Sequence, residues 1–282
     1  MLYFKYFEKQ RVDLQGKKFH FSQHFYNFNK KPSMHIFKTM VLFVSLCSFY
    51  CSQAQQQPAV YVIVHGAWGG SWAFKEVDQL LSATGSTVYR PSLTGQGERV
   101  HLADESIGLE THIMDVVNTL LYEELENIIL VGHSYGGMVV TGLADRLPER
   151  IKKLVYLDAF VPENNENVNE IFVNDPKKYK IVDGGIVPTW VTKDQLPPSD
   201  VPHPYKTFTD PIVLKNPKRL EIETHYIHTV EKGKTPETDD FILHANRARD
   251  KAWPVYILES DHNPQWSAPK PLVQLLKKIE TQ

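Results

Sequence analysis

From position 59 onward, apolar residues follow two alternating patterns. Short continuous runs rich in Val and Ile are typical of buried strands, and longer segments with apolar residues three and four positions apart are typical of amphipathic helices. In segment 111–125, for example, Ile113, Val116 and Leu120 share one helical face. The patterns predict strands at 59–66, 86–93, 127–134, 151–160, 223–231 and 254–260, and helices at 72–81, 111–125, 136–147, 239–252 and 271–280.

The alternation of strands and helices predicts an α/β fold for residues 55–282. Parallel neighbours in a sheet need crossover connections, so repeated strand–helix units indicate a mainly parallel sheet with helices on both faces. The rhythm is interrupted at about 161–222, where Pro, Asp, Asn and Lys are frequent. We interpret this stretch as a cap insertion over one end of the sheet. Its Trp190, Tyr205 and Phe208 could line a pocket or simply pack the cap.

Residues 1–54 form an N-terminal extension of different character. Lys38, an apolar run at 40–50 and a small-residue exit ending at Ala54 have the layout of a secretory signal peptide, which we place at about 34–54. The run is too short to span a bilayer as a helix, which needs about 20 residues. Signal peptides begin near the true start, so we expect translation to begin at Met34 or Met40 and the protein to be exported, to a periplasm or out of the cell.

Removal of this extension changes the composition of the chain. Both cysteines, Cys47 and Cys51, lie within it, which excludes disulfides and thiolate chemistry in the mature protein. Residues 1–54 also hold 8 of the 31 Lys and Arg and 2 of the 33 Asp and Glu, so the remainder has a net charge of −8. An acidic surface argues against nucleic acid and anionic membranes as partners. The sequence does not indicate an oligomeric state.

The candidate nucleophile is Ser134, in the motif G-x-S-x-G of the segment "VGHSYGG". A serine at a tight turn is common, but here a predicted strand precedes it and a predicted helix follows, which is the setting of a nucleophile elbow. In such a sharp turn the side chains crowd together, and Gly132 and Gly136 would remove the clash.

A nucleophilic serine needs a base and an acid that orients the base. His262 follows the last predicted strand, in the position expected for the base. Two carboxylates are candidates for the acid, and each ends a predicted strand at the same edge of the sheet: Asp158 and Glu231. We favour Asp158 because a carboxylate in an apolar strand end is costly without a partner.

An oxyanion hole needs two N–H donors. The residue after the nucleophile, Tyr135, supplies one, and Ala67 in the loop "VHGAWGGSW" after the first strand is our candidate for the other.

With these residues in place, the chain resembles the α/β-hydrolase superfamily, and within it the branch of small bacterial esterases, plant methylesterases and hydroxynitrile lyases. The resemblance rests on "VHGAWGGSW", "VGHSYGG", "LVYLDAFVP" and "DHNPQWSAP", which are spread over residues 59–282. It implies the roles given above for Ser134, His262, Ala67 and Tyr135. It leaves the acid open, because plant members place it near Glu231 and bacterial relatives with "YLDAFVP" near Asp158.

Together the motifs predict an esterase or lactonase that acts on a small molecule through an acyl-enzyme, without a cofactor. The expected mature chain, residues 55–282, has no cysteine, no HExxH motif and no cluster of carboxylates at ligand spacing, so we expect no metal site. Two alternatives remain: a non-catalytic binder on the same fold, and a hydroxynitrile lyase. Lyases of this branch carry a lysine directly after the catalytic histidine, whereas this chain has Asn263. Methyl esters, aryl esters and lactones all remain open as substrates.

Overall fold

The computed structural model describes residues 58–172, 179–192 and 194–282, and the predicted signal peptide at 34–54 lies outside them. Six strands form one sheet in the order β2-β1-β3-β4-β8-β9, in which every neighbouring pair is parallel. The strands are β1 (Val60–Val64), β2 (Thr87–Tyr89), β3 (Ile128–His133), β4 (Ile151–Leu157), β8 (Glu223–Val230) and β9 (Val255–Glu259).

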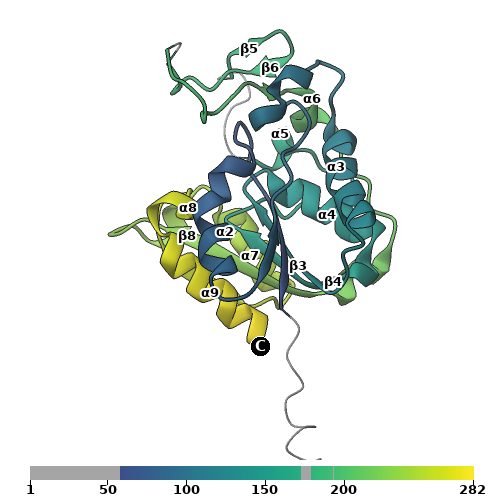
Figure 1. Cartoon of the computed structure of the whole chain (residues 1–282), viewed down its shortest axis with the longest axis vertical. Helices are drawn as coiled ribbons and strands as arrows, with labels where there is room; N and C mark the ends of the chain where they lie inside the picture. Colours follow the sequence, from purple (N-terminus) through teal and green to yellow (C-terminus); the bar gives the residue numbers. More distant parts are fainter. Residues whose placement is uncertain (1–57, 173–178, 193) are drawn as a thin grey trace, which may run out of the picture. The chain divides into compact units, whose positions relative to one another are not determined.

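Helices cover both faces of this sheet (Figure 1). The strand residues alternate between the two faces: Tyr61 and Ile63 pack with one set of helices, and Val62 and Val64 with the other. Because both faces are covered, the central strands β1 and β3 are almost continuously apolar, as the sequence shows. On one face lie α2 (Lys75–Ser82) and α9 (Pro269–Thr281), and on the other α3 (Leu109–Tyr122), α4 (Gly136–Arg146) and α7 (Ile242–Asp250). The predicted parallel sheet with helices on both faces is confirmed.

The chain between β4 and β8 contains only short elements among the described residues. They are α5 (Val168–Ile171), β5 (Ile181–Val182), β6 (Gly185–Ile186), β7 (His203–Pro204), α6 (Lys206–Thr209) and a 3-10 turn at Pro217–Glu221. Strands β5, β6 and β7 form a small antiparallel sheet, and β5, β6 and α6 lie above the main sheet in Figure 1. We call residues 161–222 the cap.

Trp68, in the loop after β1, connects the cap to the main sheet. Its indole Nε1–H donates to the Ile186 carbonyl at 2.9 Å, and its own carbonyl accepts from the Val201 amide at 2.9 Å. The Trp68 backbone has a positive φ of 64°. Two hydrogen bonds to separate parts of the cap therefore fix the loop that carries Ala67.

Two local features differ from the predicted elements. Strand β2 ends at Tyr89, because Pro91 has no N–H for a ladder and the Leu93 amide donates instead to Nε2 of His65 at 3.1 Å. A short helix that the periodicity does not reveal, α8 (Pro264–Ser267), follows His262. No helix in the described part of the chain has the length and apolar character to cross a membrane.

Candidate active site

Ser134 lies between β3 and α4 with a positive φ of 51°. Residues other than glycine rarely adopt this conformation, and it is often found at functional sites. The turn is crowded, as the motif predicts. A Cβ on Gly132 would lie 2.6 Å from Val140 Cγ2, and one on Gly136 would lie 2.6 Å from the Val64 carbonyl oxygen. The glycines are therefore required for the turn that projects Ser134.

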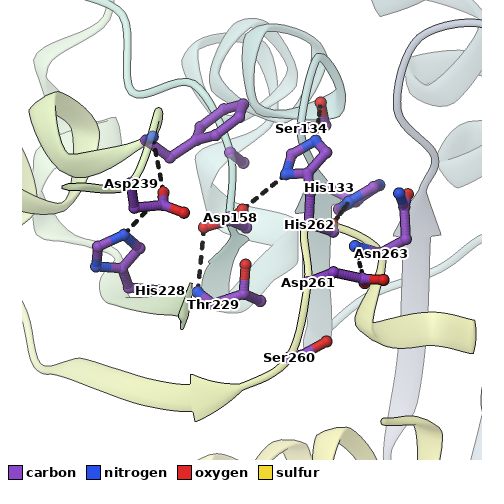
Figure 2. Close-up of polar contacts among 12 residues, drawn as sticks. His133, Ser134, Asp158, His228, Thr229, Asp239, Ser260, Asp261, His262 and Asn263 are labelled. Atoms are coloured by element: carbon purple, nitrogen blue, oxygen red, sulfur yellow. Dashed lines mark hydrogen bonds and ion pairs between the residues drawn. The ribbon is translucent and has the colours of Figure 1, made fainter. Parts of the chain in front are cut away.

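Ser134, His262 and Asp158 form a continuous chain of hydrogen bonds (Figure 2). The Oγ of Ser134 lies 2.9 Å from His262 Nε2, and His262 Nδ1 lies 2.7 Å from Asp158 Oδ2. The three residues are separated by up to 128 positions in sequence. The parallel sheet brings them together because they follow the carboxyl ends of β3, β4 and β9.

Of the two candidate acids, only Asp158 contacts His262. Its side chain is 1% exposed, and its Oδ1 accepts from the Thr229 amide at 3.1 Å. The side chain of Glu231 is 50% exposed and pairs with Lys234 at 2.7 Å. Although both carboxylates end strands at the same edge, Glu231 pairs with Lys234 and takes no part in the hydrogen-bond chain of Ser134, His262 and Asp158.

The hydrogen bonds define the tautomer of His262. An ionised Asp158 can only accept, so His262 Nδ1 carries the proton that it donates to the carboxylate. Nε2 is then unprotonated and accepts from the Ser134 hydroxyl. This is the arrangement in which an imidazole can act as a general base toward serine.

The imidazole of His262 is held between two other rings. Phe241 stacks on it with ring centroids 4.6 Å apart and an interplanar angle of 15°. His133 lies against it at 4.9 Å, and its Nε2–H donates to the His262 carbonyl at 2.8 Å. Burial, together with the neighbouring His262, lowers the pKa of His133 to about 3. His133 is therefore neutral and does not add a charge beside His262.

Phe241 is itself fixed by a second His–Asp pair. Asp239 Oδ1 accepts from the Phe241 amide at 2.8 Å and from Nε2 of His228 at 3.0 Å (Figure 2). His228 directly precedes Thr229, whose amide binds Asp158. The end of β8 thus supports both the acid and the ring that stacks on the histidine. Sequence alone assigns no role to His133, Thr229, Asp239 or Phe241, since His133 occupies a variable position of the nucleophile motif and the other three lie outside the motifs.

One group among the described residues offers ligand atoms that could hold a metal ion. Asp158, His228 and Asp239 each place one such atom within 4.8 Å of the others. In the structure both Asp158 oxygens accept protein hydrogens, from Thr229 and His262, and Asp239 Oδ1 accepts two more. These donors would have to be displaced by a metal, so the group fits a hydrogen-bonded network better than a metal site.

The two proposed oxyanion donors belong to separate segments beside Ser134. Tyr135 follows the serine directly, and the loop that carries Ala67 passes so close that a Cβ on Gly66 would lie 3.0 Å from Ser134 Cβ. Ala67 and Tyr135 both line the cavity that contains Ser134. Neither amide donates to another residue in the described part of the chain. Both are thus available to an oxygen bound next to Ser134.

Ser134 lies at the floor of a cavity of about 440 Å³ between the main sheet and the cap. We call it the cap cavity. Its walls include Phe160 and Phe241 from the main domain and Phe172, Ile186 and Phe208 from the cap. Charged residues, among them Lys180, Glu231 and Lys234, also line it. Such a volume is in the range of small-molecule sites. Tyr205 does not line it; its hydroxyl accepts from Asn169 at 3.2 Å.

Buried histidines with lowered pKa values make the stability of the fold pH-dependent, and His65, His112, His133 and His244 are four of them. Burial lowers the pKa of His65 and His112 to about 4, and of His133 and His244 to about 3. The unfolded chain protonates these groups near pH 6.5, whereas the folded chain does not. We expect the free energy of unfolding to fall from pH 6.5 toward pH 4, by about 1.4 kcal/mol per pH unit for each histidine. Urea unfolding between pH 5 and 6.5 measures this slope.

A matched pair of variants tests the source of the slope. His244→Gln removes one buried histidine and should reduce the slope by about 1.4 kcal/mol per pH unit, which corresponds to one proton. His101→Gln replaces an exposed histidine and should leave the slope unchanged. The window above pH 5 is chosen because carboxylates with lowered pKa values titrate below it. Equal slopes in His244→Gln and the parent protein would contradict the assignment.

Comparison with known proteins relates the whole described domain to one family. The model of the alpha/beta hydrolase family matches residues 61–275. The carbendazim hydrolyzing esterase of Nocardioides sp. (strain SG-4G) is 52% identical over 110 residues, which are 39% of this chain and 46% of that protein. The alpha-hydroxynitrile lyase of Arabidopsis thaliana is 30% identical over 127 residues, 45% of this chain and 48% of the lyase. The chain thus spans about half the length of the curated relatives it matches.

Solved structures resemble this one over most of their length. An extracellular alpha/beta-hydrolase from a Paenibacillus species superposes with a TM-score of 0.66 at 23% identity, over 78% of this chain and 98% of the other. A pyrethroid hydrolase from Sphingobium faniae superposes with a TM-score of 0.59 at 21% identity, over 79% of this chain and 97% of the other. At these identities the likeness concerns the fold.

Proposed function

The chain belongs to the α/β-hydrolase family, and from this premise we propose that it hydrolyses carboxylic esters, lactones included, through an acyl-enzyme on Ser134. The observation that carries the proposal is the unbroken hydrogen-bond chain from Ser134 through His262 to the buried Asp158, at the floor of a cavity. The relatives named as esterases and hydrolases support the same chemistry.

In the first half of the reaction, Ser134 Oγ attacks the ester carbonyl while His262 Nε2 takes its proton. The negative charge that develops on the carbonyl oxygen is stabilised by the amides of Ala67 and Tyr135, and each such donor contributes about 3 kcal/mol. The bond to the alcohol oxygen then breaks, and His262 returns the proton to that oxygen. The alcohol leaves, and the acyl group stays on Ser134.

In the second half, water replaces the alcohol. His262 takes a proton from the water, the hydroxide adds to the acyl carbon, and the bond to Ser134 breaks as the serine regains its proton. Asp158 accepts the Nδ1 hydrogen throughout and stabilises the imidazolium that forms twice. The side chains supply each of these proton transfers, so no step in this scheme calls on a cofactor.

Cyanohydrin cleavage is less well supported by the residues next to His262. Asn263 stands where lyases of this branch carry a lysine, and its Oδ1 accepts from Gln265 Nε2 at 3.1 Å. A neutral amide engaged in this way offers no positive charge to a cyanide ion. Ester hydrolysis needs no such charge.

Labelling with a fluorophosphonate probe tests the proposal against a binder on the same fold. An activated Ser134 Oγ displaces fluoride from phosphorus, and His262 takes the serine proton. We therefore expect one label per molecule of a protein that comprises residues 55–282, with the adduct on the peptide that contains Ser134. Mass spectrometry identifies the site.

Heat-denatured protein is the control for non-specific reaction, and Ser134→Ala is the control for the site. If native protein with an intact fold, shown by circular dichroism, remains unlabelled at Ser134, the chain is a binder and the proposed hydrolase function is wrong.

A further inference from the structure

A second cavity adjoins Ser134 and shares part of its lining with the cap cavity. It encloses about 450 Å³ and is lined in part by His133, Asn263, Gln265 and Trp266. We call it the α8 cavity, because Gln265 and Trp266 belong to α8. Ala67, Trp68, Ser134, Trp190 and His262 line both cavities. The nucleophile and the base therefore lie at the junction of two spaces of similar size.

On this basis, and resting on the proposed ester hydrolysis, we propose that the substrates of this protein are esters with a bulky group on each side of the scissile bond, one group filling the cap cavity and the other the α8 cavity. When Ser134 attacks a carbonyl carbon, the bonds to the acyl chain and to the alcohol oxygen point in different directions from the tetrahedral centre. The oxyanion takes a third direction, toward Ala67 and Tyr135. The two cavities that meet at Ser134 can receive the two organic parts separately.

Both cavities combine apolar and polar lining residues. The cap cavity joins aromatic and aliphatic side chains with charged ones such as Lys180, Glu231 and Lys234. The α8 cavity presents hydrogen-bond acceptors. Gln265 is 1% exposed, and its Oε1 has no hydrogen-bond partner among the described residues. Asp200 lines the same cavity; it accepts from Trp190 Nε1 at 2.7 Å and has a pKa raised by burial. An occupant with an N–H or O–H group would satisfy these acceptors.

The α8 cavity also has space and an aromatic wall. Trp266 stacks on Trp72 with centroids 5.5 Å apart and an interplanar angle of 19°. Gly69 and Ala73 line the same cavity and leave it open, since a Cβ on Gly69 would meet no atom closer than 3.9 Å. No lysine or arginine is among the described residues that line it. The cavity thus suits a neutral planar group that donates hydrogen bonds.

Four esters of similar intrinsic reactivity test the proposal: methyl acetate, methyl 4-phenylbutanoate, 4-phenylbutyl acetate and 4-phenylbutyl 4-phenylbutanoate. All are esters of primary alcohols, so differences in kcat/KM report binding of the added groups. We expect each phenyl-bearing group to raise kcat/KM about 30-fold and the two gains to multiply, because the groups occupy separate cavities. If the doubly substituted ester is no better than the better single one, the substrate is one-sided and the proposal is overturned.

Two cavity-filling variants serve as matched controls for each other. Ala73→Trp fills the α8 cavity and Val187→Trp the cap cavity. We expect each variant to abolish the rise in kcat/KM that one phenyl-bearing half gives, and to leave the rise given by the other half unchanged. If both variants abolish the rise from the same half, the proposal is overturned. A third variant, Gln265→Leu, tests the polar wall of the α8 cavity. The substrate is an ester that carries an amide N–H on the half that Ala73→Trp excludes from this cavity. We expect Gln265→Leu to lower kcat/KM for this ester at least fivefold and to leave kcat/KM for the corresponding phenyl ester unchanged.

The proposal and the hydrolase function fail in different ways. Hydrolysis of methyl 4-phenylbutanoate without any gain from a second bulky group would leave the hydrolase function standing and remove the two-cavity proposal. Hydrolysis of none of the four esters by protein that is folded would count against the hydrolase function, and the two-cavity proposal would be lost with it.

Discussion

Replacing Ser134 with alanine is expected to lower kcat for ester hydrolysis by about 10⁵-fold or more, with no more than a small change in substrate binding. The reason is chemical rather than structural. The Oγ that lies 2.9 Å from His262 Nε2 is the only atom of the side chain that is lost, and without it no acyl-enzyme forms. The strained φ of 51° at this position is the same for serine and alanine, so the fold should persist. Single-turnover kinetics with a chromogenic ester measures the loss.

A hydroxyl in the same cavity provides a matched control. Thr238 lines the cap cavity, and its hydroxyl donates to the Thr235 carbonyl at 2.9 Å, away from His262. Thr238→Val should keep kcat within a few-fold of the parent protein. If Ser134→Ala retained a tenth of the parent activity, an acyl-enzyme on Ser134 would not be the route of hydrolysis.

The sequence predicted the main sheet well because its central strands are buried on both faces. Continuous runs such as 127–134 and 151–160 can be recognised without knowledge of their neighbours, and strong amphipathic helices such as α3 carry an equally local signal. The cap was harder. Its β5, β6 and β7 are two residues long and are held by contacts with Trp68 and with one another, so no run of side chains encodes them. Helix α8 is only four residues long, so its sequence carries no apolar periodicity that would predict it.

The candidate site could be predicted only as far as local motifs extend. Ser134 and His262 stand beside glycines and strand ends that mark their positions. The acid remained open between Asp158 and Glu231, because both follow strands that end at one edge and sequence does not show where a side chain points. The supporting groups are set by tertiary packing. Thr229 acts through its backbone amide and Phe241 through its ring, and neither residue type signals such a role.

Replacing Asp158 with asparagine is expected to lower kcat by about 10⁴-fold, equivalent to about 5.5 kcal/mol of barrier, with little loss of stability. The Thr229 amide donates to Oδ1 and fixes the orientation of the side chain. An asparagine with its oxygen on that amide turns its NH₂ toward His262 Nδ1. That nitrogen must then accept, the imidazole proton moves to Nε2, and His262 can no longer take the proton of Ser134.

Glu231→Gln is the matched change at the other candidate acid, and it should leave kcat within about twofold of the parent value. Glu231 is half exposed and pairs with Lys234 rather than with His262, and exposed pairs of this kind contribute about 0–1 kcal/mol. The steady-state pH profile of each variant, with thermal unfolding as a check of the fold, separates a change of tautomer from a loss of structure.

Near-parent turnover in Asp158→Asn together with a collapse of turnover in Glu231→Gln would assign the acid to Glu231 and would require the 231–241 loop to move toward His262. The stack of Phe241 on the imidazole and the hydrogen bonds that Asp239 accepts from Phe241 and His228 oppose such a movement, and for this reason we expect the loss to follow Asp158.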